Sequence, residues 1–250
     1  METGEKLKTL ARLLREHQPA FALTGAGVST ESGIPDFRSR GEGLWERYDP
    51  AEVCSVEALH RDPARFWRFN LRWWRGCREA QPNAAHRALA ALERAGLLRG
   101  VITQNIDGLH RAAGSTVWEV HGHLRTCRCM RCDRRHDFAC LLEQIDDGAD
   151  VPRCPCGGML RPDVVLFGDA MGKDYWRATQ VLTGCQMLLV VGSSLQVYPV
   201  AGLPRLARRL AIVNREPTPY DEEAAVVIHR AAGETLRSLL AELEMEDAGP

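Results

Sequence analysis

The polar segment at 103–110, with the sequence Thr-Gln-Asn-Ile-Asp-Gly-Leu-His, contains the side chains best suited to chemistry. Gln104, Asn105 and Asp107 follow the apolar run 100–102, which predicts a short β-strand. Ligands of open α/β sheets bind outside the carboxyl ends of the strands, so polar side chains at this position predict a binding site. The alternative is a loop in which Asn105 and Asp107 only cap the next helix.

A second predicted strand, at 116–120, leads into His121 and Gly122. An imidazole in this position titrates near neutral pH and can serve as a general base. The alternative is a histidine that occupies a turn and has no chemical role.

A glycine-rich turn comes earlier in the chain. A predicted strand at 21–24 runs into the sequence Gly-Ala-Gly-Val-Ser at 25–29. Two glycines let the backbone approach a phosphate, and the helix that follows supplies free N–H groups. The third glycine of a dinucleotide fingerprint is absent because position 30 is Thr. No acid stands at the end of an obvious second strand about 20 residues on, where a dehydrogenase holds its ribose, which argues against that class of enzyme.

Two further regions suit a nucleotide. The segment 31–40 is predicted to be a long loop in which Asp36 and Arg38 orient the rest of a nucleotide, or in which they form a solvated ion pair. A small-residue turn at 192–194 and the polar Asn214 each follow an apolar strand. Both are predicted to face the same ligand.

Six of the nine cysteines lie between 127 and 156. An odd count and this clustering favour a metal site over disulfide bonds. Four thiolates from two pairs hold Zn²⁺ with no open position, which is a structural site. The pairs are Cys129 with Cys132 and Cys154 with Cys156. Because the second pair is one residue closer than Cys-x-x-Cys, Cys127 is an alternative ligand. Free cysteines are the other alternative.

The elements that position these residues alternate between strands and helices. Further strands are predicted at 187–192, 210–214 and 225–228, and helices at 5–17, 82–95, 137–145, 174–182 and 234–243, with another helix ending at 206–209. This alternation predicts an α/β fold with a Rossmann-like, doubly wound parallel sheet.

Two insertions leave the sheet and form a smaller domain, namely a helical module at 36–80 and a zinc-ribbon module at 123–159. The Rossmann domain then comprises 1–35, 81–122 and 160–250. Aromatic residues in the helical module recur at helical spacing, which favours a core position for Phe66, Phe69, Trp73 and Trp74. His86, at the start of a predicted helix, is interpreted as a structural or capping residue.

The composition excludes several classes of protein. The chain has 250 residues, 45% of them apolar, and a formal net charge of −1. The apolar fraction is large enough for a sizeable core. The near-zero net charge gives no general attraction to nucleic acid or an anionic membrane. Residues 1–20 lack the apolar run of a secretory signal, and no segment approaches the ~20 apolar residues of a membrane span. We therefore expect a soluble cytoplasmic protein.

The chain resembles the sirtuins, the NAD-dependent protein deacylases, and in particular their prokaryotic deacetylases. The resemblance rests on motifs that occur in family order between 24 and 232. They are Gly25-Ala26-Gly27-Val28-Ser29, Gly33-Ile34-Pro35-Asp36-Phe37-Arg38, Thr103-Gln104-Asn105-Ile106-Asp107, His121-Gly122, the four paired cysteines, Val164-Val165-Leu166-Phe167-Gly168, Gly192-Ser193-Ser194-Leu195 and Val213-Asn214.

This resemblance implies a Rossmann domain, a small domain with one structural Zn²⁺, and a substrate cleft between them. It implies that His121 and Asn105 are catalytic, with His121 as the general base. The residues implied to bind NAD are Gly25, Ala26, Gly27, Ser29, Asp36, Phe37, Arg38, Gln104, Asn105, Asp107, Gly192, Ser193, Ser194, Asn214 and Ala232. Those implied to receive the peptide are Val164, Val165, Phe167 and Gly168.

The reaction that the resemblance implies needs no protein nucleophile. The amide oxygen of an acyl-lysine attacks the ribose carbon that bears nicotinamide. His121 takes a proton from the ribose hydroxyls, and water then releases free lysine and 2′-O-acyl-ADP-ribose. The protein orients the reactants, excludes water and supplies a base.

The acyl group is predicted to be acetyl or another neutral group. Sirtuins that prefer succinyl- or malonyl-lysine carry a Tyr-x-x-Arg pair on the helical module, and Asn70 and Trp73 stand at those places here. An anionic acyl group would therefore lack its bidentate partner. Arg72 and Arg75 are the alternative cations. A further departure is Asp169, which stands where the family usually has Glu.

Other functions are compatible with some of these motifs. Transfer of ADP-ribose to a protein uses the same NAD site, and a long-chain deacylase uses the same chemistry. A zinc-ribbon module that only binds NAD, or that binds nucleic acid, is disfavoured by the near-neutral charge and the polar cluster. The expected partner is an acylated lysine in a protein or peptide, without nucleic acid or membrane, and a monomer is favoured.

Overall fold

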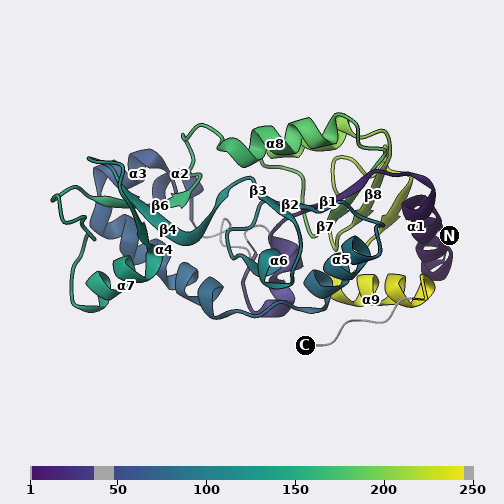
Figure 1. Cartoon of the computed structure of the whole chain (residues 1–250), viewed down its shortest axis with the longest axis horizontal. Coiled ribbons are helices and arrows are strands. Elements are labelled where there is room, and N and C mark those ends of the chain that lie inside the picture. Colours follow the sequence, from purple (N-terminus) through teal and green to yellow (C-terminus); the bar gives the residue numbers. More distant parts are fainter. Residues whose placement is uncertain (1, 37–47, 245–250) are drawn as a thin grey trace.

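The computed structural model describes residues 2–36 and 48–244. A six-stranded parallel sheet forms its larger domain, with the order β3-β2-β1-β7-β8-β9 (Figure 1). The strands are β1 (Ala20–Thr24), β2 (Val101–Thr103), β3 (Val117–Glu119), β7 (Met187–Val191), β8 (Leu210–Val213) and β9 (Val226–Ile228). The chain leaves β1 in one direction and β7 in the other, so the predicted doubly wound topology is confirmed.

Helices cover both faces of this sheet. Figure 1 shows α8 (Lys173–Leu182) above it, and α5 (Ala84–Arg94) and α9 (Ala232–Glu242) below it. Helix α1 (Thr3–Glu16) packs in the same core as α5 and α9, and the 3-10 helix η4 (Val200–Leu206) packs with α8. Alternate residues of each strand point to opposite faces, so both sets must be apolar, which is why these strands read as continuous apolar runs.

The helix predicted to end at 206–209 is present as the 3-10 helix η4, which ends at Leu206 and has Pro204 inside it. A proline has no N–H to donate and its ring clashes with the preceding turn, so an α-helix cannot continue through it. Short helices follow two of the strands, namely η1 (Ala26–Val28), η2 (Thr30–Ser32) and α6 (Leu109–Ala112).

In its described residues, the smaller domain combines a three-stranded antiparallel sheet with four helices. The sheet has the order β5-β4-β6, from β4 (Gly122–Cys129), β5 (Arg135–Asp137) and β6 (Leu160–Val164). The helices are α2 (Pro50–Val53), α3 (Val56–Arg61), α4 (Pro63–Glu79) and α7 (Phe138–Asp146). Phe66, Trp67 and Trp74 of α4 pack with Phe138 of α7, so the two insertions share one core.

The strand β6 differs from the sequence expectation. It pairs with β4 and belongs to the small sheet, whereas the expected boundary at 160 places it in the Rossmann domain. The five residues of β6 (Leu160–Val164) do not specify which strand they pair with, so the sequence could not decide between the two sheets. Within the described residues, no helix has both the length and the apolar character needed to cross a membrane.

Candidate active site

One cavity of about 610 Å³ lies at the carboxyl ends of the parallel strands. Its walls come from the segments after β1, β2, β3, β7 and β8, and from α4 and the segment after β6 in the smaller domain. This is the position at which open α/β sheets bind ligands, at the point where the strand order reverses. His121 and all the described residues predicted to bind NAD or peptide line the cavity, whereas the four paired cysteines do not. Phe37 and Arg38 lie outside the described residues.

The glycine turn after β1 interlocks with the turn after β7. The Gly27 N–H donates to the Gly192 carbonyl at 2.9 Å, and a Cβ added at Gly25 would lie 2.9 Å from the same oxygen. Gly192 has a φ of +61°, and a Cβ there would lie 2.3 Å from the Val28 nitrogen. These glycines are therefore required by the contact between two turns, as well as leaving backbone open to the cavity.

A serine joins the amide and the carboxylate of the segment after β2. The Asn105 Nδ2 donates to the Gly25 carbonyl at 3.1 Å and to the Ser29 Oγ at 2.9 Å. The Ser29 hydroxyl donates to the Asp107 Oδ2 at 2.7 Å. Burial raises the pKa of Asp107 above its usual value, opposed by hydrogen bonds from the Leu109 N–H and Ser29. The network fixes the direction of the Asn105 side chain at the cavity wall.

A second bridge crosses the point where the strand order reverses. The Gln104 Nε2 donates to the Ser193 Oγ at 2.9 Å, which ties the segment after β2 to the turn after β7. Beyond it, Asn214 follows β8 and donates to the Glu216 carbonyl at 2.7 Å. Ser194 and Ala232 also line this end of the site. Polar groups therefore run along the carboxyl edge of the sheet, as a dinucleotide requires.

The geometry of His121 leaves one ring nitrogen free to act as a base. Its Nδ1 lies 3.0 Å from the Gln104 carbonyl oxygen. A carbonyl only accepts hydrogen bonds, so Nδ1 carries the proton and Nε2 keeps a lone pair. Burial lowers the pKa of His121, and the bond to Gln104 opposes this shift. The imidazole is therefore neutral at pH 7, which is the form that accepts a proton.

Two other buried histidines have structural roles. His86 lies in the capping box of α5, where its Nδ1 accepts from the Asn83 N–H, so the predicted capping role is confirmed. The His110 Nε2 contacts the Thr24 hydroxyl at 2.9 Å, and the His86 and His110 rings lie with their centroids 4.6 Å apart and their planes tilted by 54°. Burial lowers the pKa of His86 to about 4 and that of His110 well below its usual value.

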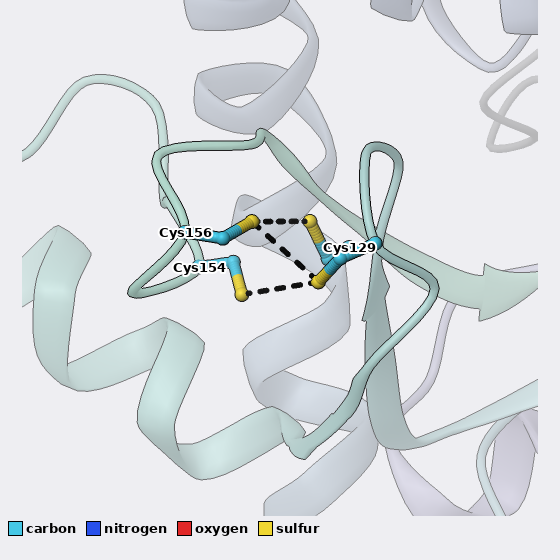
Figure 2. Close-up of side chains that lie close together, drawn as sticks. Cys129, Cys154 and Cys156 are labelled. Atoms are coloured by element: carbon cyan, nitrogen blue, oxygen red, sulfur yellow. Dashed lines mark hydrogen bonds between the residues drawn. The ribbon is translucent and has the colours of Figure 1, made fainter.

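The four paired cysteines converge in the small domain, as predicted. Figure 2 shows Cys129, Cys154 and Cys156 with their sulfurs pointing toward one another. The four Sγ atoms lie within 4.8 Å of one another, with Cys129–Cys156 at 3.5 Å and Cys132–Cys154 at 3.8 Å. A tetrahedral Zn²⁺ with Zn–S bonds of about 2.3 Å places its sulfurs roughly 3.8 Å apart. The donor set therefore fits one structural Zn²⁺.

Cys127 is not part of this cluster. Its Sγ faces the carbonyl oxygens of His136 and Asp137, at 3.7 and 3.8 Å. It lies on β4 two residues before Cys129, with its side chain in the core of the small domain. The alternative in which Cys127 replaces a ligand is therefore not supported.

The segment after β6 lies between His121 and the helical module. The Val165 N–H donates to the His121 carbonyl at 2.8 Å, and the Phe167 N–H donates to the Cys54 carbonyl at 3.0 Å. In the described part of the chain, the Val165 carbonyl and the Gly168 N–H make no hydrogen bond. Phe167 is 41% exposed, and Val164 is buried. The segment therefore offers main-chain groups to an extended peptide at the mouth of the cavity.

The predicted core position of the aromatic stripe on α4 is wrong in part. Phe66 lies in the core, whereas Phe69 and Trp73 are half-buried and line the cavity with Asn70 and Cys77. Periodicity did not show that Phe69 and Cys77 line the cavity, because it shows which residues share a helix face, but not what that face meets; Asn70 and Trp73 were placed near the acyl group only by the family resemblance. Five further cavity residues were also not predicted. Their only indication in the sequence is that they follow the ends of predicted strands; they are Gln196, Val197, Tyr198, Arg215 and Arg230.

The fold and the cavity together define a Rossmann-like α/β protein with a dinucleotide-type site and a zinc-type cysteine cluster. The Sir2 family profile matches residues 25–199. NAD-dependent protein deacetylase 2 of Caldanaerobacter subterraneus subsp. tengcongensis is 47% identical over 241 residues, which cover 96% of each protein. The NAD-dependent protein deacetylase of Caldivirga maquilingensis is 47% identical, over 98% of this chain and 95% of its own length.

Solved structures agree with these relatives. A Sir2 structure with a deacetylated p53 peptide and 3′-O-acetyl ADP ribose has a TM-score of 0.91 and 36% identity, over 96% of this chain and 99% of that one. A complex of Sir2 with a p53 peptide and NAD⁺ has a TM-score of 0.87 and 36% identity, over 95% of this chain and 98% of that one. The chain belongs to the Sir2 family.

Proposed function

We propose that this protein is an NAD-dependent protein lysine deacetylase, with nicotinamide, 2′-O-acetyl-ADP-ribose and free lysine as products. The observation that carries the proposal is the unprotonated Nε2 of His121 in the cavity that unites the nucleotide-type edge and the open segment 164–168. The relatives named as NAD-dependent protein deacetylases, and the Sir2 complexes with NAD⁺ and peptide, support it.

NAD is assigned to the carboxyl edge of the sheet. The glycine turn and the Gln104–Ser193 bridge hold the phosphates and ribose, while Asn214 and Ala232 hold the adenosine end. Asn105, fixed by Gly25 and Ser29, orients the reacting ribose. NAD supplies the electrophilic ribose carbon that receives the acyl oxygen. The protein contributes orientation and exclusion of water.

His121 is assigned as the general base. Its Nδ1 is held by the Gln104 carbonyl, so its Nε2 is the atom that accepts the ribose-hydroxyl proton. A peptide that pairs with Val165 and Gly168 would bring its acyl-lysine toward this imidazole. A positioned general base typically contributes 10²–10⁴-fold to the rate.

The acyl group is assigned as neutral. Arg75 is ion-paired with Asp146 at 2.5 Å, and neither Arg72 nor Arg75 lines the cavity. The carboxylate of Asp107 lies in the same cavity wall and disfavours a second anion. We therefore expect acetyl-lysine to be turned over faster than succinyl- or malonyl-lysine.

Zinc has a structural role in this proposal. Cys129, Cys132, Cys154 and Cys156 would hold the ion with no open position, so it would supply no chemistry to the reaction. The ion would join the β4–β5 turn to the segment before β6. The cytoplasmic location, the monomeric state and the lack of nucleic-acid or membrane partners stay predictions from the sequence.

Mass spectrometry of an acetyl-lysine peptide, with and without NAD, tests the function. The expected result is NAD-dependent loss of the acetyl group together with formation of O-acetyl-ADP-ribose. A peptide that gains the mass of ADP-ribose would instead show ADP-ribosyl transfer. If the acetyl peptide is left intact while the same peptide carrying a long-chain acyl-lysine loses its acyl group, the protein is a long-chain deacylase.

Two histidine variants test the assignment of the base. His121→Ala should lower the rate by about 100-fold or more with the fold intact. His123→Ala is the matched control, because His123 is two residues away and does not line the cavity. Equal rates for His121→Ala and the unaltered protein would overturn the assignment.

A further inference from the structure

One buried guanidinium holds both ends of the segment that leads from the smaller domain to the larger one. Arg161 lies on β6 with its side chain 9% exposed, and its two terminal nitrogens donate to the two carboxylate oxygens of Asp169 at 3.0 and 2.6 Å. Its Nη2 also donates to the Val164 carbonyl at 3.2 Å. This side chain therefore ties together the residues on either side of the segment 165–168, which runs from β6 toward α8 (Figure 1).

Asp169 closes a tight turn at the end of this segment. Its N–H donates to the Leu166 carbonyl at 3.0 Å, and its Oδ2 accepts from the Leu166 N–H at 2.9 Å. Gly168, the third residue of the turn, has a φ of +91°, and a type II turn requires a positive φ at that place. The main chain and the carboxylate thus close the same turn, and Arg161 orients the carboxylate.

The turn determines where the main-chain groups offered to a peptide lie. The Val165 carbonyl precedes the turn, and the Gly168 N–H is part of it. Between them, Phe167 makes two main-chain hydrogen bonds with residues 54–56, which hold the opposite edge of the segment. If the turn opened, the separation of the two groups on the peptide edge would change. Arg161 does not line the cavity, so it can act on a peptide only through this segment.

Stability does not account for this ion pair. The cost of taking two charges out of water offsets much of their attraction, and apolar residues often replace a buried pair without loss of stability. The Arg161 Nε is also buried and has no hydrogen-bond partner among the described residues, which adds a further cost. What the pair does supply is direction, because a bidentate guanidinium fixes the orientation of a carboxylate.

We propose that Arg161 and Asp169 are positioning residues for the acyl-lysine peptide, which hold the segment 164–168 in the conformation that pairs with it. The proposal rests on the proposed deacylase function and adds the part of the structure that sets affinity for the peptide. The pair takes no part in NAD binding or in the chemistry at His121. Its loss lowers the fraction of molecules in the binding-competent conformation, and the Kd for the peptide rises by the inverse of that fraction.

Peptide affinity and steady-state kinetics test the proposal together. Fluorescence anisotropy of a labelled acetyl-lysine peptide gives its Kd without turnover. In Arg161→Met, we expect the Kd and the KM for the peptide to rise about tenfold or more, as they would if the segment kept its present conformation a tenth of the time. The kcat at saturating peptide and the KM for NAD should stay within about twofold, because only binding of the peptide is weakened.

Arg161→Lys keeps the charge but not the planar fork, so its peptide Kd should lie between those of Arg161→Met and the unaltered protein. It tests the same point if the methionine variant folds poorly. The double variant Arg161→Met with Asp169→Ala separates positioning from stability. It buries no unpaired charge, so its Tm should exceed that of Arg161→Met, while its peptide Kd should stay about tenfold above that of the unaltered protein. A role in stability alone predicts that affinity recovers together with Tm.

Arg75→Met is the matched control. Arg75 forms an ion pair with Asp146 in the same domain, but both side chains are exposed and their described contacts do not reach the segment 164–168. This variant should leave the peptide Kd unaltered. An unaltered peptide Kd in both single variants of Arg161, or an equal loss of NAD and peptide affinity, would overturn the role of the pair.

The same measurements distinguish failure of this proposal from failure of the proposed function. If the unaltered protein binds the peptide but does not deacylate it in the presence of NAD, the proposed function is overturned, and the peptide Kd values of the variants still decide the role of Arg161. If the unaltered protein does not bind the peptide, both proposals are overturned.

Discussion

The ion pair between Glu119 and Arg125 should respond very differently to the loss of each partner. Glu119 ends β3 in the large sheet, and Arg125 lies on β4 in the small sheet. The Arg125 Nη1 and Nη2 donate to the two carboxylate oxygens at 2.7 and 2.5 Å. His121 lies between the two residues, so the pair fixes both ends of the turn that carries the proposed base.

The exposure of the two side chains determines the expected cost. The Glu119 side chain is 3% exposed, so Arg125→Met leaves a buried carboxylate whose one remaining ion-pair partner in the described part of the chain is Arg111, at 3.8 Å. Removing one partner of a buried pair costs about 3–5 kcal/mol, and the remaining arginine should reduce this to about 2–4 kcal/mol. Glu119→Gln should cost about 1–2 kcal/mol, because Arg125 is 41% exposed and can turn toward water.

The double variant Glu119→Gln with Arg125→Met should be more stable than Arg125→Met alone, because no unpaired charge is then buried. Urea denaturation measures the free energy of unfolding. A scanning calorimeter should show a fall in Tm of roughly 10 °C for Arg125→Met. We also expect kcat to fall more than the KM for NAD changes, because the pair positions His121 and not the glycine turn.

Arg128→Met is the matched control. Arg128 is on the same strand with the same 41% exposure, but its carboxylate partner Asp163 is 3.9 Å away and keeps Arg135. This variant should cost less than about 1 kcal/mol. The reasoning is refuted if Arg125→Met is no more costly than Arg128→Met, or if Glu119→Gln is the most costly of the three.

Three further outcomes are expected. Cys156→Ser should abolish binding of one Zn²⁺ per chain, measured by atomic absorption, whereas Cys127→Ser should retain it; equal zinc content in both variants would contradict the assignment of the ligands. Because the pKa of His86 falls to about 4 on folding, the unfolded chain binds more protons below pH 6.5. The free energy of unfolding should then decrease by roughly 2 kcal/mol from this residue between pH 7.5 and 5, and undiminished stability at pH 5 would refute this. Gly192→Ala should destabilise the fold by about 1–3 kcal/mol and weaken NAD binding measured by calorimetry, since its Cβ would lie 2.3 Å from the Val28 nitrogen; unaltered affinity would show that the two turns separate easily.

Much of the site could be predicted because strand ends are local features. An apolar run followed by Gln104 and Asn105, or one followed by His121, predicts both an element and a ligand edge from a few residues. The cysteine spacing likewise limits a metal site to a few thiols. These predictions needed no knowledge of which strand lies beside which.

The remaining features depend on residues that are distant in the sequence. Gly25 and Gly27 looked like a phosphate turn, and their contact with Gly192 exists only because β1 lies beside β7. Cys127 and Cys129 share one face of β4 and one core, but the Cys127 Sγ lies beside the His136 and Asp137 carbonyls, and Cys129, at the end of the strand, reaches the cluster; composition could not decide this.

The sequence by itself determined the alternation of strands and helices, the polar residues at their ends and the family resemblance. Only the tertiary structure decided that β6 pairs with β4, that Trp73 faces the cavity while Trp67 faces the core, and that Glu119 meets Arg125. The physical reason is that periodicity specifies which residues share a face of an element. The partner of that face is set by packing between elements that are far apart in the chain.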